Sequence, residues 1–123
     1  MKLDIVTPER QLMSTEAASV QIPGMEGDMT IMDNHAAVVT TLRPGVVAVS
    51  DGQRFVVTGG FAEVSSSGTS ILAEQAVPEA EASREMINDL IANAQTAEET
   101  APSDQKAAAR QRVNDLQTLV ARL

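Results

Sequence analysis

The sequence predicts an α+β protein in which an N-terminal antiparallel β-sandwich is followed by a C-terminal antiparallel two-helix hairpin. Up to residue 78, short runs rich in β-branched residues recur about every 8 to 12 residues, with turn residues between them. Beyond that point the apolar residues recur at intervals of three and four, as in amphipathic helices. All 7 glycines precede residue 69, and the remainder is rich in alanine. We therefore expect two domains, 1–78 and 79–123.

The composition limits what the protein can do. The chain has 123 residues, of which 43% are hydrophobic, but it lacks Trp, Tyr and Cys and has only 2 Phe, so its core must be aliphatic. The formal net charge of -8 and the scarcity of basic clusters argue against nucleic-acid binding. Without cysteine there is no disulfide framework and no thiolate chemistry.

No apolar run approaches the roughly 20 residues that a membrane-spanning helix needs, so we expect no direct membrane insertion. The first residues carry Asp4 where a signal peptide would need its apolar region. These features predict a bacterial cytoplasmic setting.

The first strand is expected over residues 3–7, because Pro8 cannot donate to a β-ladder and suits a strand end. A second extended segment begins at Leu12. The next run alternates before a Pro-Gly turn, and its buried face is expected to hold Ala18, Val20 and Ile22.

Residues 24–45 contain the only histidine and turn signals at both ends. A short strand with Met29 and Ile31 should meet a turn at Asp33-Asn34, just before His35. A Pro-Gly turn at residues 43–45 predicts a hairpin. The remaining strands are expected over 38–42, 46–49, 54–58, 61–65 and 69–73.

The helical region is expected to begin at Pro78, since the missing N–H of proline is harmless at the first helical position. Residues 98–102 interrupt the helical pattern, and Ser103 is a candidate cap for the second helix. The first helix should bury Ala82, Met86, Ile87, Leu90, Ile91 and Ala94. The second should bury Ala109, Val113, Leu116, Val120 and Leu123, with Leu119 beside them.

The order of these parts resembles the epsilon subunit family of the bacterial rotary (F-type) ATP synthase. The matching stretches are 3–9, 24–27, 35–36 with Thr40, 42–47, 59–64 and 71–74. The resemblance implies a non-catalytic rotor (central-stalk) subunit, with no cofactor, whose sandwich binds the gamma subunit and the c-ring. It also implies a hairpin that either folds down or extends towards the alpha and beta subunits, where it restrains ATP hydrolysis. The implied location is the cytoplasmic face of the bacterial inner membrane.

The chain departs from the family's pattern around its histidine. Asp33-Asn34 replaces the usual Pro-Gly turn, Ala37 replaces a proline, and Thr30 replaces a glycine. Asp and Asn tolerate unusual backbone angles, so we expect a turn to form here nonetheless.

By this resemblance, Asp28 occupies an acidic position near the polar loops of the c-ring. We expect Asp28, Met29, Met32 and His35 to form one partner-binding surface near one end of the sandwich. The alternative readings are a solvated turn acid and methionines that fill the core. With no Cys and no second His, we expect His35 to take part in neither metal binding nor catalysis.

Some family members bind ATP through a motif that aligns with residues 80–85. Here only an acid, Glu81, and the arginine, Arg84, are kept, and Glu85 adds a negative charge, so we expect no nucleotide binding. The basic residues through which the hairpin would restrain hydrolysis are Arg110, Arg112 and Arg122. Alternatively, the hairpin is only a stabilising appendage.

Two classes of function remain open on the residues alone. One is the torque-transmitting rotor subunit. The other is a free-standing small β-sandwich module that binds a ligand or a protein. Ligand pockets usually combine aromatic side chains with convergent polar groups, and the scarcity of aromatic residues weakens the second class.

Overall fold

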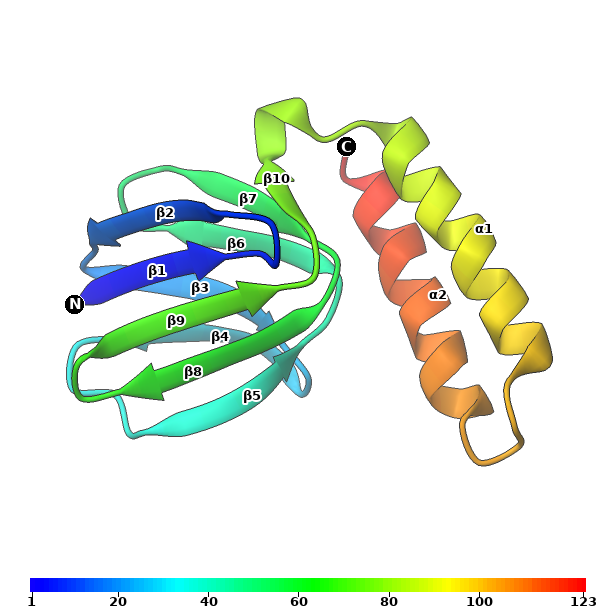
Figure 1. Cartoon of the computed structure of the whole chain (residues 1–123), viewed down its shortest axis with the longest axis horizontal. Coiled ribbons are helices and arrows are strands. Elements are labelled where there is room, and N and C mark those ends of the chain that lie inside the picture. The colour runs from blue at the N-terminus through cyan, green and yellow to red at the C-terminus, as the bar shows by residue number, and fades with distance from the viewer. The chain divides into compact units, whose positions relative to one another are not determined.

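The computed structural model describes residues 1–123, which form two compact units, Met1–Glu79 and Ala80–Leu123 (Figure 1). The first unit holds the strands and the second holds the two α-helices. Each unit is described separately below.

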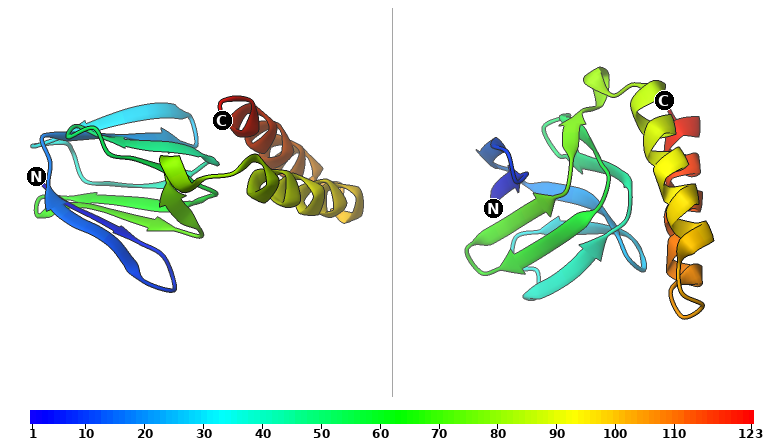
Figure 2. Two further views of the ribbon diagram at one scale, coloured as in Figure 1. Left: turned by 90° about the horizontal axis from the view of Figure 1, so that it is seen from above. Right: turned by 45° about the vertical axis from the view of Figure 1, so that its right-hand side comes forward.

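The first unit is a β-sandwich built on a 10-stranded sheet that folds over on itself. Its layers are seen edge-on in the left view of Figure 2. Neighbouring strands follow the order β10-β7-β6-β3-β5-β8-β9-β1-β2, and β4 pairs with β3. The strands are β1 (Lys2–Val6), β2 (Gln11–Glu16), β3 (Ser19–Gly24), β4 (Gly27–Met32), β5 (Val38–Leu42), β6 (Gly45–Val49), β7 (Arg54–Val57), β8 (Gly60–Ser65), β9 (Gly68–Ala73) and β10 (Ala76–Pro78).

Alternation along the strands creates the core. In β1, for example, Leu3 and Ile5 are fully buried while their neighbours are not, as expected where successive side chains point to opposite faces. The pairings are antiparallel except between β1 and β9, which run parallel. The core is aliphatic apart from one aromatic residue, Phe55.

Two expectations about the sandwich are wrong. Ala18 is exposed, because β3 begins only at Ser19, and the buried alanine is Ala17. Pro78 does not begin a helix but ends β10, where it lies opposite Phe55 of β7. An edge strand suits proline, which has no N–H to donate. The short strand β10 itself was not predicted.

The second unit contains α1 (Arg84–Thr100) and α2 (Lys106–Ala121), preceded by a 3-10 turn, η1 (Glu79–Glu81), that spans the boundary. The side chain of Ser83 caps α1 by accepting a hydrogen bond from the Met86 N–H at 3.1 Å. A break was predicted at residues 98–102, but α1 continues to Thr100 and the helices are separated by residues 101–105. Ser103 does not cap α2. Its N-cap residue is Gln105, which makes no side-chain cap bond.

The helices of the hairpin pack against each other. Lys106 joins them further, since its Nζ donates to the Glu98 carbonyl at 3.1 Å and places a positive charge at the C-terminal end of α1, where the helix dipole favours it. The buried residues are Ile87, Ala94, Val113, Leu116 and Leu119. Leu119, predicted at the edge of the stripe, is therefore more buried than Val120. Neither helix is long and apolar enough to span a bilayer.

Candidate partner-binding surfaces

The predicted surface around Asp28 begins at a tight β-hairpin. Strands β3 and β4 stay in register to their last pair, Gly24 opposite Gly27, with Pro23 opposite Asp28. The carboxylate of Asp28 is exposed. Met25, at the tip, keeps 54% of its surface exposed. The turn therefore presents an acid and a flexible apolar side chain to solvent.

Asp28 and His35 do not share an end of the sandwich, so that prediction is wrong. Asp28 lies at the start of β4, whereas Met32 ends the strand and His35 follows it. The steps from Asp28 to Met32 span about 13 Å at roughly 3.3 Å per residue in a strand. The sequence predicts a strand here, but the predicted grouping neglected the length of that strand, which separates Asp28 from His35.

The far end of β4 is held by local bonds. Asn34 adopts a positive φ of 68°, which Asn tolerates better than most residues, and the His35 N–H donates to the Met32 carbonyl at 3.2 Å. The predicted turn thus forms without Pro-Gly. The Nδ1 of the His35 ring lies 2.7 Å from the carbonyl oxygen of its neighbour, Ala36.

Asp33 also takes part in an ion-pair cluster with the chain's first residue. The Met1 ammonium lies 3.1 Å from Asp33 Oδ1 and 3.4 Å from Glu16 Oε2. The pKa of this amine is raised above its ordinary value, chiefly by the hydrogen bond to Asp33. These bonds tie the start of β1 to the turn after β4.

The four methionines between residues 13 and 32 divide into two groups. Met13 is buried and Met29 is partly buried against the core, so both fill the interior. Met25 and Met32 are more than half exposed, and they lie at opposite ends of the β3–β4 pair. Only these two are available to a partner.

A second surface was not predicted, and it lies on the outer face of β5, β8 and β9. Phe61 and Leu72 lie directly opposite each other on β8 and β9, and they are 53% and 43% exposed. Val39 of β5, on the same face, is 68% exposed. We call Val39, Phe61 and Leu72 the apolar face. It also carries one charge, because the exposed Glu63 lies directly opposite Val39 on the same face of β8. Strand alternation could have revealed the apolar face, because a buried Ala62 and Val64 force Phe61 outward.

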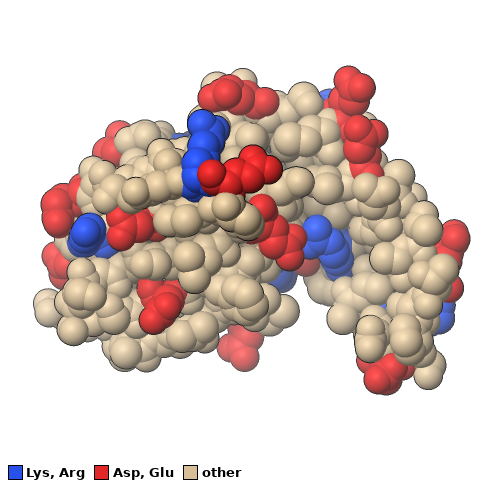
Figure 3. Space-filling view, viewed as in Figure 1, with Lys and Arg blue, Asp and Glu red and all other residues tan.

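Charged residues make up 21% of the chain, and acids outnumber bases. On the side seen in Figure 3, acidic side chains are scattered and broad areas carry no charge. No group of three or more His, Cys, Asp or Glu residues is arranged to hold a metal ion.

The three arginines proposed for regulation do not form one patch on the hairpin. Arg110 and Arg112 are two residues apart, so they point about 200° apart around α2. Arg110 Nε is engaged by Glu98 Oε1 at 3.0 Å, and Arg122 is the C-cap residue of α2. The structure thus gives these side chains different surroundings.

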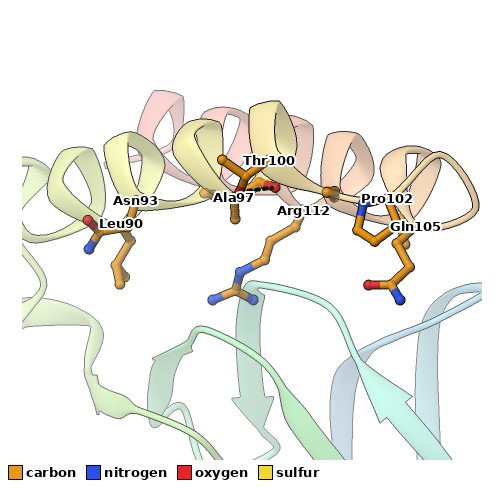
Figure 4. Close-up of a pocket in the computed structure, with 11 residues that line it drawn as sticks. Leu90, Asn93, Ala97, Thr100, Pro102, Gln105 and Arg112 are labelled. Carbon is orange, nitrogen blue, oxygen red and sulfur yellow. Dashed lines mark hydrogen bonds between the residues drawn. The ribbon is translucent and has the colours of Figure 1, made fainter.

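Arg112 lines a groove of about 650 Å³ on the hairpin. Figure 4 shows Leu90, Gln105 and Arg112 pointing to the same side of the helices. The other lining residues are mostly small or polar: Asn93, Ala94, Ala97, Thr100, Ala101, Pro102, Ala108 and Ala109.

The residues aligned with the nucleotide motif have structural surroundings of their own. Glu81 ends η1 and is exposed. Arg84 opens α1, and its Nε donates to the Leu123 carbonyl at 3.2 Å. Arg84 thereby links the beginning of α1 to the residues after α2.

Comparison with known proteins identifies the family. Residues 1–79 match the model of the ATP synthase delta/epsilon chain β-sandwich domain. The chain is 44% identical to an ATP synthase epsilon chain of Fuscovulum blasticum, over 98% of this chain and 94% of that protein. It is 48% identical to the epsilon chain of Ruegeria sp. (strain TM1040), over 85% and 78%.

Two solved structures share the fold. One is a chain in the cryo-EM structure of the Euglena gracilis mitochondrial ATP synthase, with a TM-score of 0.71 and 24% identity over 98% of this chain and 79% of that chain. The other belongs to the central stalk and c-ring of the Tetrahymena thermophila mitochondrial enzyme, with a TM-score of 0.65, 13% identity and coverage of 98% and 96%. At these identities the likeness concerns the fold. On the family model and the curated relatives together, the chain belongs to the delta/epsilon chain family of ATP synthase.

Proposed function

We propose that this chain is a non-catalytic subunit of the ATP synthase central stalk, which couples the gamma subunit to the c-ring at the cytoplasmic face of a bacterial inner membrane. The observation that carries the proposal is its similarity to ATP synthase epsilon chains along almost the whole length of both proteins. A role in transmitting torque requires fixed surfaces on a rigid body, and the sandwich offers two.

The apolar face is the proposed gamma-binding surface. Permanent interfaces between subunits are more hydrophobic than ordinary protein surface, and exposed apolar side chains that gather on one face mark interaction sites. Phe61 and Leu72 are adjacent across two strands and lie on a sheet whose other face is the core. Covering them with a partner would remove both side chains from water.

The turn at residues 25–28 is the proposed c-ring contact. Its acid, Asp28, and its apolar tip, Met25, are both exposed. A carboxylate gives such a contact a preference for basic or polar loops, and Met adapts its shape to irregular surfaces. Met32 and His35, at the far end of β4, are proposed to lie outside this contact, and Met29 supports the turn from within the core.

The hairpin is the proposed regulatory element, which reaches the alpha and beta subunits. The basic residues proposed for this contact are Arg110, which pairs with Glu98, Arg112, which lines the groove, and Arg122, at the end of α2. The competing role is that of a stabilising appendage with no effect on hydrolysis.

Affinity purification of the tagged full-length chain from membranes tests the assignment. We expect gamma and c subunits to co-purify with it. Phe61→Glu should abolish recovery of gamma, because it places a charge in an apolar interface, whereas Ser65→Glu on the outer face of the same strand should not. Recovery of no synthase subunit would contradict the proposal and leave a free-standing binding module.

The c-ring contact is tested separately. Asp28→Lys should reduce recovery of the c-ring while gamma is retained, because the reversed charge repels basic ring loops. Asp51→Lys, which reverses an exposed acid in another turn, is the matched control. Equal recovery of the c-ring with both variants would show that Asp28 is only a solvated turn acid.

A further inference from the structure

One residue, Arg43, holds the last two carbonyl groups of β3. The Arg43 N–H donates to the Pro23 carbonyl at 2.8 Å. The Arg43 Nε donates to the Gly24 carbonyl at 2.9 Å, in a partly buried bond. A hydrogen bond from a charged group is stronger than one between neutral groups. The backbone and the side chain of Arg43, which lies between β5 and β6, thus bind two neighbouring residues of β3.

These bonds lie where β3 changes partners. Earlier in the strand, Val20 and Gln21 pair with β6. At its end only Gly24 pairs with Leu42 of β5. Pro23 has no N–H with which to extend either ladder. β4 pairs along the whole of β3 on one side, but the ladder to β5 and β6 on the other side is sparse. The bonds from Arg43 extend the contacts of β3 on that second side.

Close packing surrounds the same place. A β-carbon on Gly45 would lie 2.7 Å from the Pro23 Cβ, and one on Gly24 would lie 2.9 Å from the Met29 Sδ. The Gly45 contact shows that the turn that follows Arg43 lies directly against Pro23 at the end of β3, and the Gly24 contact shows close packing within the β3–β4 hairpin. We call Pro23, Gly24, Arg43 and Gly45 the β3 junction.

The turn proposed to contact the c-ring projects directly from the β3 junction. Asp28 is the register partner of Pro23, and Gly27 is the partner of Gly24. The two residues held by Arg43 are therefore those that set the direction of Asp28. Beyond them only Met25 and Glu26 complete the turn, and both are exposed. The turn is seen where β3 meets β4 in Figure 1.

We propose that Arg43 is a positioning residue that fixes the direction of the turn at residues 25–28, and so of Asp28, toward the c-ring. The inference rests on the proposed function, because it assumes that this turn contacts the ring. Lysine cannot replace Arg43 in this role. Its single ammonium group lacks the Nε–H that lies part-way along the arginine side chain and reaches Gly24.

The test uses the full-length chain bound to gamma, with detergent-solubilised c-rings as the probe. Arg43→Lys keeps the charge but loses the Nε bond, and we expect it to weaken ring binding about tenfold, the effect of losing one charge-assisted hydrogen bond. Binding to gamma should not change. Arg54→Lys, at the exposed Arg54–Glu79 pair of the same sandwich, is the matched control and should leave ring binding as in the wild type.

Methyl NMR of the methionines supplies a readout that does not depend on any partner. In Arg43→Lys the Met25 methyl group should become more mobile and shift, while that of the buried Met13 should not. Gly45→Ala disturbs the β3 junction from its other side and should reproduce both the loss of ring binding and the motion of Met25.

The two proposals fail in different ways. If Asp28→Lys weakens ring binding while Arg43→Lys changes neither ring binding nor the motion of Met25, the positioning role is overturned and the proposed function stands. If Asp28→Lys has no effect on ring binding, the ring contact is overturned. If, in addition, the mobility of the Met25 methyl group is unchanged in Arg43→Lys, then Arg43 does not restrain the turn at residues 25–28 either.

Discussion

The interior of the sandwich is one continuous apolar cluster, whereas the buried side chains of the hairpin are few and an open groove lies beside them. In the sandwich, residues far apart in sequence meet in fixed register, as Leu3 of β1 meets Thr69 of β9. In the hairpin, a few buried side chains, such as Ile87 and Leu116, and single polar contacts, such as Arg110 with Glu98, hold together two helices that are adjacent in sequence. This difference suggests a rigid body that carries partners and an element that can alter its contacts.

Gly60→Ala should cause the largest loss of stability. Gly60 has a φ of +128°, and an added β-carbon would lie 2.1 Å from the Leu72 carbonyl oxygen. Backbone strain and overlap together should lower the free energy of unfolding by about 3 kcal/mol or more, measured by urea denaturation. Gly52→Ala is the control, with a φ of +99° but open space around it, and should cost about 1 kcal/mol. Equal losses of stability in the two variants would contradict the close packing around Gly60.

A matched pair of core substitutions tests whether the two units unfold separately. Ile71 in the sandwich and Leu116 in the hairpin are both 0% exposed, so replacement of either by Ala should cost about 2–5 kcal/mol in its own unit. Amide hydrogen exchange should rise throughout the strands for Ile71→Ala and only over α1 and α2 for Leu116→Ala. If the strands of the Leu116→Ala variant also lost protection from hydrogen exchange, the chain would unfold as one unit.

Truncation after Glu79 tests what the hairpin does. The cut keeps the Arg54–Glu79 pair, with Nε 3.0 Å from Oε1, and so spares the sandwich. Residues 1–79 should fold and still bind gamma. ATP hydrolysis by the membrane enzyme should rise if the hairpin restrains it. Unchanged hydrolysis would leave only the stabilising role for the hairpin.

The smallest expected effect is that of ATP on the hairpin. Arg84 is engaged with the Leu123 carbonyl, and Glu85 adds an acid to the first turn of α1, where it would repel a triphosphate. NMR signals of the helices should therefore not change with ATP up to about 1 mM, a concentration that would detect a weak site. A saturable shift in α1 would contradict this and give the hairpin a nucleotide site.

Much of the sandwich could be predicted, because alternation of apolar residues is a local signal. Val20 and Ile22 are buried as the pattern predicts. Errors occurred at the ends of elements, where propensity competes with pairing. Pro78 suits a helix start as well as an edge strand, and only its pairing with Phe55 decides between them.

The candidate surfaces were predicted less well. Asp28 is exposed at the start of β4, beside the turn, but its grouping with His35 is wrong, because residues close in sequence are far apart when a strand joins them. Alternation along β8 is enough to show that Phe61 points outward, but Val39 and Leu72 come from other strands, and alternation does not show which of their residues lie beside Phe61.

The sequence by itself determined the α+β organisation, the aliphatic core, the change from strands to helices and the family, since each depends on residue types and their spacing along the chain. The tertiary structure alone decided that β1 pairs with β9, that Phe61 lies beside Leu72, and that Arg43 binds the end of β3. These contacts join residues distant in sequence. They depend on the register of strand pairing and on which side chain reaches which carbonyl, and neither leaves a periodic trace in the sequence.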